Sequence, residues 1–170
     1  MRKPLDLLYD AAAWLAAFFM VGVLAMVLAS VVGRLAGFNL PGSDAYAGYC
    51  MAAASFLALA HTLKRGEHIR VMLFLERFGG RLRRALDLWS HLAGTFFCGV
   101  LAFYSVRLAW QSHAYNDVSQ GSDATPLWIP QLAMALGAAV LFVAMVDDFV
   151  RVLRGRELPA AADAEPKRIE

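Results

Sequence analysis

The sequence predicts an all-α integral membrane protein with four transmembrane helices, both termini in the cytoplasm, and an amphipathic interfacial helix between the second and third transmembrane helices. Three observations lead to this fold class. The chain has 170 residues, of which 59% are apolar, above the roughly 45–50% of soluble domains. Its charged residues cluster between long uncharged stretches. Four of those stretches have the roughly 20 residues needed to cross a hydrocarbon core of about 30 Å.

The connections between the predicted spans carry recognisable turn and capping signals. Pro41 and Gly42 predict a turn before the second span, and Asp44 falls where a first-turn acid stabilises a helix. Pro126 and Pro130 open the fourth span, where a missing backbone N–H is tolerated. The first span is longer than the apolar core of a signal peptide, about 7–15 residues, so we expect it to be retained. The four predicted spans cover residues 11–33, 45–63, 86–110 and 127–146.

Basic residues are divided unequally between the two sides of the membrane. An even number of spans puts both termini on one side, which holds all Lys and Arg residues of the chain except Arg34 and Arg107. Because basic residues near span ends stay in the cytoplasm, the termini and the central basic segment are predicted to be cytoplasmic. Arg107 can extend to the membrane surface beside interfacial aromatic residues. We predict one membrane domain over residues 1–150 and a charged cytoplasmic tail over 151–170.

The segment between the second and third spans has the pattern of an amphipathic helix over about residues 67–84. Apolar residues recur at helical spacing on one face and basic residues occupy another, as in helices that lie among lipid headgroups. A charged loop that only fixes the orientation of the chain is the alternative, and the two interpretations are compatible. The Gly79-Gly80 pair predicts a bend or break. The apolar positions are Val71, Phe74, Leu75, Phe78 and Leu82, and the basic positions are Arg70, Arg77, Arg81 and Arg84.

The predicted spans lack the features of a transport pathway. No acidic or basic residue lies near the middle of a span, and no proline interrupts one. Ionisable side chains inside a membrane are costly and mark substrate and ion pathways, so we expect the chain not to carry a polar substrate by itself. Enzyme motifs such as HExxH and the P-loop are missing. We therefore predict no enzyme activity, no metal site and no cofactor in this chain, and no binding of nucleic acid.

Two histidines leave a different function open. His61 and His91 lie near the inner ends of the second and third spans. They could sit at similar depth on neighbouring antiparallel helices, as the two axial ligands of a haem b do. The chain would then be a haem-binding membrane anchor of an electron-transfer complex. The alternative is that each histidine makes local hydrogen bonds at the membrane interface, and a generic structural membrane protein without a transporter partner is a further possibility.

Several short motifs, taken in their order along the chain, resemble the small (Q, DctQ-type) membrane subunit of the tripartite ATP-independent periplasmic (TRAP) transporters. Residues 66–71, Gly-Glu-His-Ile-Arg-Val, match the family's Gly-x-His-Ile-Arg-Val signature, and residues 125–130 resemble its start of the fourth span. Asp44 departs from the family, which more often has Glu there, but keeps the charge. The residues that carry the resemblance are Arg34, Pro41, Gly42, Asp44, Gly66, His68, Arg70, Pro126 and Trp128.

The resemblance implies a sodium-coupled importer of organic acids, such as C4-dicarboxylates or sialic acid-like sugars, in the bacterial inner membrane. A large (M) membrane subunit would carry the substrate and the sodium sites, and a periplasmic substrate-binding protein would capture the substrate. The small subunit would scaffold the large one among the membrane lipids and help dock the binding protein. Arg34 and Asp44 could instead cap helix ends, as a mutual ion pair. The candidate docking residues are Arg34, Asp44, Asn116, Asp117 and Asp123.

Overall fold

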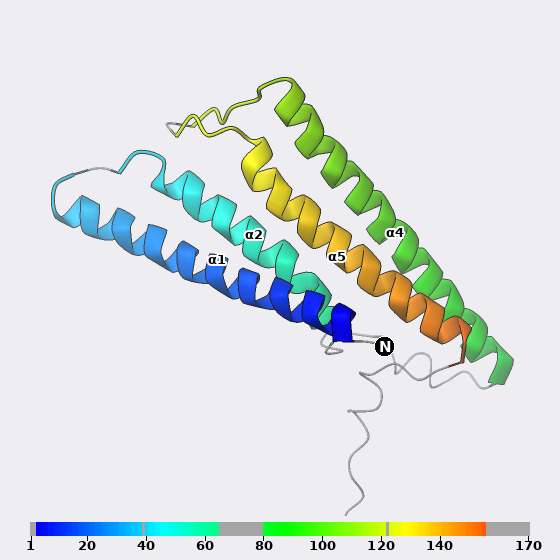
Figure 1. Ribbon diagram of the computed structural model, residues 1–170. Helices are drawn as coiled ribbons and strands as arrows, with labels where there is room; N and C mark the ends of the chain where they lie inside the picture. Colours follow the sequence, from blue (N-terminus) through cyan, green and yellow to red (C-terminus); the bar gives the residue numbers. More distant parts are fainter. Residues whose placement is uncertain (1–2, 39, 65–79, 122, 156–170) are drawn as a thin grey trace, which may run out of the picture.

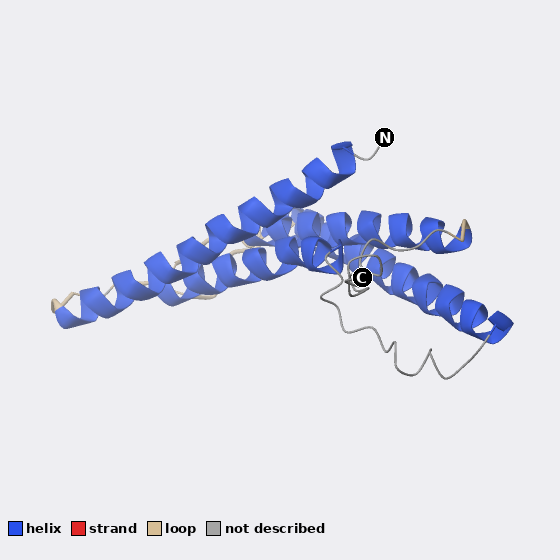
Figure 2. Ribbon diagram, turned by 90° about the horizontal axis from the view of Figure 1, so that it is seen from below, coloured by secondary structure: helices blue, strands red, loops and turns tan. Residues whose placement is uncertain are grey.

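The computed structural model describes residues 3–38, 40–64, 80–121 and 123–155. They form four long helices, α1 (Lys3–Leu35), α2 (Ser43–Lys64), α4 (Gly80–Ala114) and α5 (Trp128–Leu153), as Figure 1 shows. Within these ranges the only β-structure is one isolated bridge, so helices dominate the view in Figure 2. Each helix is long and apolar enough to cross a membrane. The predicted all-α class with four spans is confirmed.

The helices are longer than the predicted spans, mainly at the end of the molecule that holds the N-terminus. α1 begins at Lys3 and not at residue 11, and α5 continues to Leu153 and not to residue 146. α4 begins at Gly80, so the last residues of the predicted interfacial helix, 80–84, are the first turn of α4. The other residues of that predicted helix lie outside the described residues. A span predicted from hydropathy ends at the first charged residue. The helix itself can continue past that residue when the charge is paired with another side chain.

The helices pack in the order α1, α2, α5, α4. α2 packs against α1 and α5, and α5 packs against α2 and α4. The two short connections make α1–α2 and α4–α5 antiparallel hairpins, and the hairpins meet along α2 and α5. Both short connections lie at one end of the molecule, while the N-terminus and the end of α5 lie at the other (Figure 1). α1 and α4 therefore form the two flanks.

The hairpins meet at close range because small residues line α2 and α5. A Cβ atom added to Gly137 would lie 2.5 Å from the carbonyl carbon of Phe56, and such absent side chains let membrane helices approach. Gly94 faces only the flexible end of Met145, and nothing lies within 4 Å of the Cβ position of Gly48. Gly48 is therefore not a site of close helix contact within the described residues. The alanines buried on the two helices are Ala53, Ala54, Ala60, Ala135, Ala138 and Ala144.

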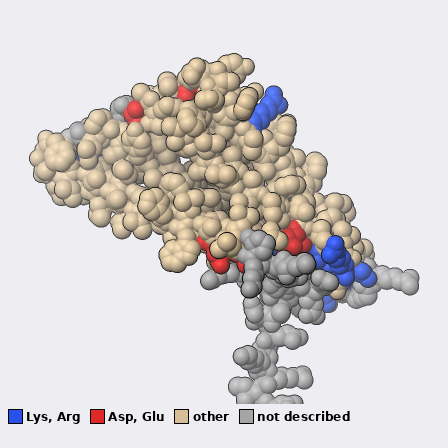
Figure 3. All heavy atoms as spheres, in the orientation of Figure 1, with Lys and Arg blue, Asp and Glu red and all other residues tan. Residues whose placement is uncertain are grey.

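The flanks of the molecule expose large apolar side chains. In the most apolar 18 residues of α1, only 6% are buried, and Trp14 is 79% exposed. Figure 3 shows an uncharged surface over most of the view, with acidic and basic residues gathered near the two ends of the helices. Monomeric soluble proteins rarely expose apolar patches of this extent. These flanks are surfaces for lipid or for another membrane helix.

Candidate functional site

The connection between α4 and α5 is a folded loop, not an extended linker. The backbone N–H of Ser119 donates to the carbonyl of Thr125 at 2.8 Å, and the N–H of Leu127 donates to the carbonyl of Asp117 at 3.0 Å. Asn116 turns the chain with φ of 54°, a conformation that asparagine tolerates better than most residues. The loop consequently has a defined shape at the end of the molecule opposite the N-terminus.

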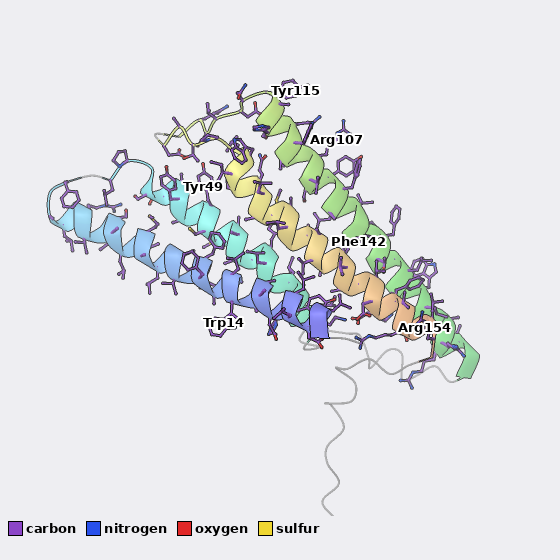
Figure 4. The ribbon with its side chains drawn as sticks, in the orientation of Figure 1. Trp14, Tyr49, Arg107, Tyr115, Phe142 and Arg154 are labelled. Carbon is purple, nitrogen blue, oxygen red and sulfur yellow. The ribbon has the colours of Figure 1, made fainter. Side chains whose placement is uncertain are left out.

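The same loop is attached to the start of α2 through side chains. The hydroxyl of Tyr49, labelled in Figure 4, donates to Oδ2 of Asp123 at 3.1 Å, and Ser119 Oγ donates to Oδ1 of that carboxylate at 2.9 Å. The hydroxyl oxygens of Thr125 and Tyr46 lie 3.0 Å apart, within hydrogen-bond distance. The α4–α5 loop and the first turns of α2 thus form one surface. We call it the outer platform after the predicted orientation, in which this end faces away from the cytoplasm.

Asp123 is the ionised centre of the outer platform. Side-chain hydrogen bonds lower the pKa of Asp123 from 3.8 to about 2. The bond from Thr125 has the largest effect, those from Ser119 and Tyr49 add to it, and together they outweigh desolvation. The folded state therefore binds a proton less readily than the unfolded state does. The stabilisation that follows is complete above the unfolded value of 3.8 and is lost only as the pH falls toward 2. Asp123 carries its negative charge throughout the physiological range.

Gly42 allows the loop to approach α2. Its φ is +82°, and an added Cβ would lie 2.8 Å from the Cβ of Asp123. We expect Gly42→Ala to detach the loop and to raise amide hydrogen exchange over residues 117–125 by about tenfold or more, because overpacking costs about 1–3 kcal/mol. Gly37→Ala is the matched control, since φ at Gly37 is +81° and nothing lies within 4 Å. Equal exchange in the two variants would show that backbone strain alone matters.

The structure separates the predicted docking residues into two groups. Arg34, in the last turn of α1, and Asp44, in the first turn of α2, are exposed. No ion pair between them occurs among the described residues, so the structure does not support the mutual ion pair. Asn116 and Asp117 are also exposed, whereas Asp123 is half-buried and turned into the outer platform. Four of the five residues are therefore available to a partner.

The motif residues that carried the resemblance concentrate around the same platform. Pro41 and Pro126 are exposed in the two connections, and Trp128 begins α5 with its ring 5.2 Å from the ring of His113, edge to face. These contacts join the outer ends of α4 and α5. Several predicted positions lie outside the described residues: Gly66, His68, Arg70, Val71, Phe74, Leu75, Arg77 and Phe78. The same applies to the side chain of Arg81.

The opposite end of the molecule holds a buried ionic cluster. Lys64 Nζ donates to Asp147 Oδ2 at 2.7 Å and to Asp148 Oδ1 at 3.0 Å. Arg151 Nη2 donates to the same Oδ2 of Asp147 at 2.7 Å, and the Lys64 ammonium lies 5.2 Å from the centre of the Tyr9 ring. Asp148 is 2% exposed. This inner cluster connects α1, α2 and α5.

Sequence reasoning missed the inner cluster. Lys64 directly follows the predicted second span, and Asp147 and Asp148 directly follow the predicted fourth span, so no pattern within one span linked them. A usable signal was present, because two adjacent acids and a lysine stood at the same predicted depth on spans that enter the cytoplasm together. The cluster explains why α5 remains helical beyond residue 146.

The two histidines of the haem alternative do not lie on neighbouring helices. His61 is on α2 and His91 is on α4, and α5 lies between these helices (Figure 1). Nδ1 of His61 lies 3.9 Å from Oδ1 of Asp10, and Nδ1 of His91 lies 2.8 Å from the carbonyl oxygen of Asp87. The expected placement on neighbouring helices is wrong, and each histidine has a local partner. Among the described residues, no group of three or more His, Cys, Asp or Glu could hold a metal ion.

Four apolar helices whose ionic clusters gather at their ends define a multi-pass membrane protein. The family comparison makes this class specific: a model of the DctQ component of the tripartite ATP-independent periplasmic transporters matches residues 23–155. The match spans most of the chain, and the chain belongs to this family, the small permease component of TRAP transporters. No curated protein matches the chain significantly. The family places the chain in a three-part transporter with a large membrane subunit and a binding protein.

Proposed function

We propose that this chain is the scaffold subunit of a sodium-coupled TRAP transporter that imports an organic acid across the bacterial inner membrane. The observation that carries the proposal is the position of its charges. The inner cluster and the outer platform lie at opposite ends, and residues 11–33 of α1 and 128–146 of α5 contain no charged residue between them. Such helices offer lipid and neighbouring helices an apolar surface, and they offer a substrate no polar pathway. Substrate and sodium would bind to the large subunit.

Reconstitution tests this division of labour. The large subunit and the binding protein would be placed in proteoliposomes with and without this chain, and uptake of labelled C4-dicarboxylate and sialic acid would be followed under a sodium gradient. We expect uptake only with both membrane subunits, together with sodium-dependent substrate binding to the large subunit alone. Full uptake without this chain, or no association between the two membrane subunits, would contradict the proposal.

We further propose that the outer platform helps dock the periplasmic binding protein through its exposed polar residues. Combining Asn116→Gly, which keeps the positive φ, with Asp117→Ala should weaken docking about three- to tenfold, because single rim contacts contribute modestly to binding. Docking would be measured by interferometry on the detergent-solubilised complex. Arg154→Ala, at the opposite end of the molecule (Figure 4), should leave docking unchanged. An equal effect of the two changes would refute the assignment.

We also propose that the basic residues of segment 67–84 bind anionic lipid headgroups on the cytoplasmic side. Each basic residue near such a surface contributes on the order of 1 kcal/mol, so four together form a strong anchor. Reversing all four charges at Arg70, Arg77, Arg81 and Arg84 should lower the amount of inserted, assembled complex severalfold, as measured by quantitative blotting of membranes. Unchanged yield and transport would show that these charges have no anchoring role.

A further inference from the structure

The outward side of α4 carries an aromatic ridge with a seven-residue period. Its members, Trp89, Phe96, Phe103 and Trp110, are 70%, 65%, 62% and 74% exposed. A side chain that faces lipid needs only to be apolar, whereas a strict seven-residue repeat keeps one row facing a partner helix in a left-handed pair. Most helix pairs in membranes cross in this left-handed manner. The ridge therefore has the spacing of a helix–helix contact surface, and none of the four described helices occupies it.

The ridge is separate from the surface by which α4 packs on α5. α4 packs along α5, and the residues that this packing buries are Ala102, Ser105, Ala109 and Ser112. Phe103 follows Ala102 and Trp110 follows Ala109. Each aromatic side chain is therefore turned about 100° around the helix axis from its buried neighbour. The positions between the ridge aromatics are Ala93, Val100 and Arg107. Alternation of large and small residues lets a second helix interdigitate, and Arg107 is the one charge in the row.

Arg107 lies about two turns before the outer end of α4, which ends at Ala114. His113, whose ring contacts Trp128 at the outer end of α5, comes six residues after Arg107. Six residues span about 9 Å along the helix axis. Thr95 comes twelve residues before Arg107, which is about 18 Å along the helix axis. The Thr95 hydroxyl lies 3.4 Å from the Met145 carbonyl, near the inner cluster. Together these lengths approach a hydrocarbon core of about 30 Å. Arg107 therefore lies within the apolar part of α4, closer to its outer end than to its inner end.

The Arg107 side chain extends away from the rest of the chain. Figure 4 shows it on the side of α4 turned from the other helices. The Cα–Cβ bonds of a helix tilt toward its N-terminus, which for α4 is the inner end, so the side chain starts away from the outer headgroups. No described residue forms an ion pair with Arg107. Basic side chains within apolar spans commonly pair with an acidic group.

We propose that the aromatic ridge with Arg107 is the seam on which one transmembrane helix of the large subunit packs, and that this helix carries a carboxylate level with Arg107. The proposal rests on the proposed function, which supplies the large subunit as partner. A second copy of this chain fits less well, because two copies sharing the seam in one membrane would bring their Arg107 side chains to the same depth, where like charges repel. A guanidinium within an apolar row selects an acidic partner.

Site-specific crosslinking tests the seam directly. A photo-crosslinking amino acid would replace Phe103 in one variant and Leu101 in another, with the large subunit co-expressed in the native membrane. Leu101 is also exposed, but it lies two positions away and so points about 160° away around the helix. We expect an adduct with the large subunit from position 103 and not from position 101. Lipid adducts alone from position 103, or adducts between copies of this chain, would overturn the seam.

Charge substitution tests the counter-charge. Arg107→Glu is expected to reduce co-purification of the large subunit by about tenfold or more, since removing one member of a desolvated charge pair weakens association strongly. Arg107→Lys should retain most of it. Reversal of the acidic residue found near the position-103 adduct should restore assembly with Arg107→Glu. If the wild-type chain fails to retain the large subunit, the proposed function fails; if wild type and Arg107→Glu retain it equally, only the seam fails.

Discussion

Replacing Lys64 by methionine is expected to lower the free energy of unfolding by about 3 kcal/mol, the low end of the range for breaking a buried ion pair by removing one partner. The ammonium lies 2.7 Å from Asp147 and 3.0 Å from Asp148. Asp148 is 2% exposed, so water has little access to its carboxylate when the ammonium is gone. Asp147 retains Arg151 and its side chain is 25% exposed, which is why we expect the lower value. Unfolding would be followed by titration with a denaturing detergent in mixed micelles.

Three companion variants make the Lys64 result interpretable. Lys64→Arg keeps the positive charge and should recover most of the stability. Adding Asp148→Asn to Lys64→Met removes the excess negative charge and should restore part of the loss. Arg154→Met changes an exposed basic residue at the same end and should shift stability by less than about 0.5 kcal/mol. If Lys64→Met is as stable as Arg154→Met, the inner cluster does not hold α2 against α5.

Gly137→Leu is expected to be the second most damaging change, because it forces α2 and α5 apart. Even the first carbon of a side chain would lie 2.5 Å from the Phe56 carbonyl, and this contact is with backbone, which cannot turn aside as a flexible side chain does. Overpacking of this kind costs about 1–3 kcal/mol and sometimes more. We expect a lower midpoint of thermal unfolding in detergent and a smaller yield of the complex with the large subunit.

Gly48→Leu is the matched control for Gly137→Leu. Both glycines lie inside transmembrane helices, α2 for Gly48 and α5 for Gly137, but nothing lies within 4 Å of the Cβ position of Gly48. The control should keep or slightly increase the stability of the isolated chain, because the helix propensity of leucine exceeds that of glycine by slightly less than about 1 kcal/mol. A loss in thermal stability at Gly48 equal to that at Gly137 would mean that the close approach of α2 and α5 is not what glycine provides.

Hydropathy and charge were sufficient for the outline of the fold. Four apolar stretches predicted four helices, and Pro41-Gly42 and the polar residues after Ala114 predicted the two connections that join them into hairpins. These features are local, because each can be recognised from a short stretch of adjacent residues. All five docking candidates came from the sequence, because polar residues between two spans must lie at a membrane surface, and four of the five are exposed.

Which helices touch, and where, followed from the folded chain. Spans that are apolar all round have no distinctive face, so the sequence did not place α5 between α2 and α4 or separate His61 from His91. The same reason hid the pairing of Lys64 with Asp147 and Asp148, which are distant in sequence, and the role of Asp123 as an anchor for the outer platform. Local patterns thus determined the number of helices and the places where the chain turns between them, but not how far α1, α4 and α5 extend beyond the predicted spans. Side-chain volume decided which helices are neighbours. The need of each buried charge for an opposite charge decided the ion pairs between helices. Both depend on residues that only the packed structure brings together.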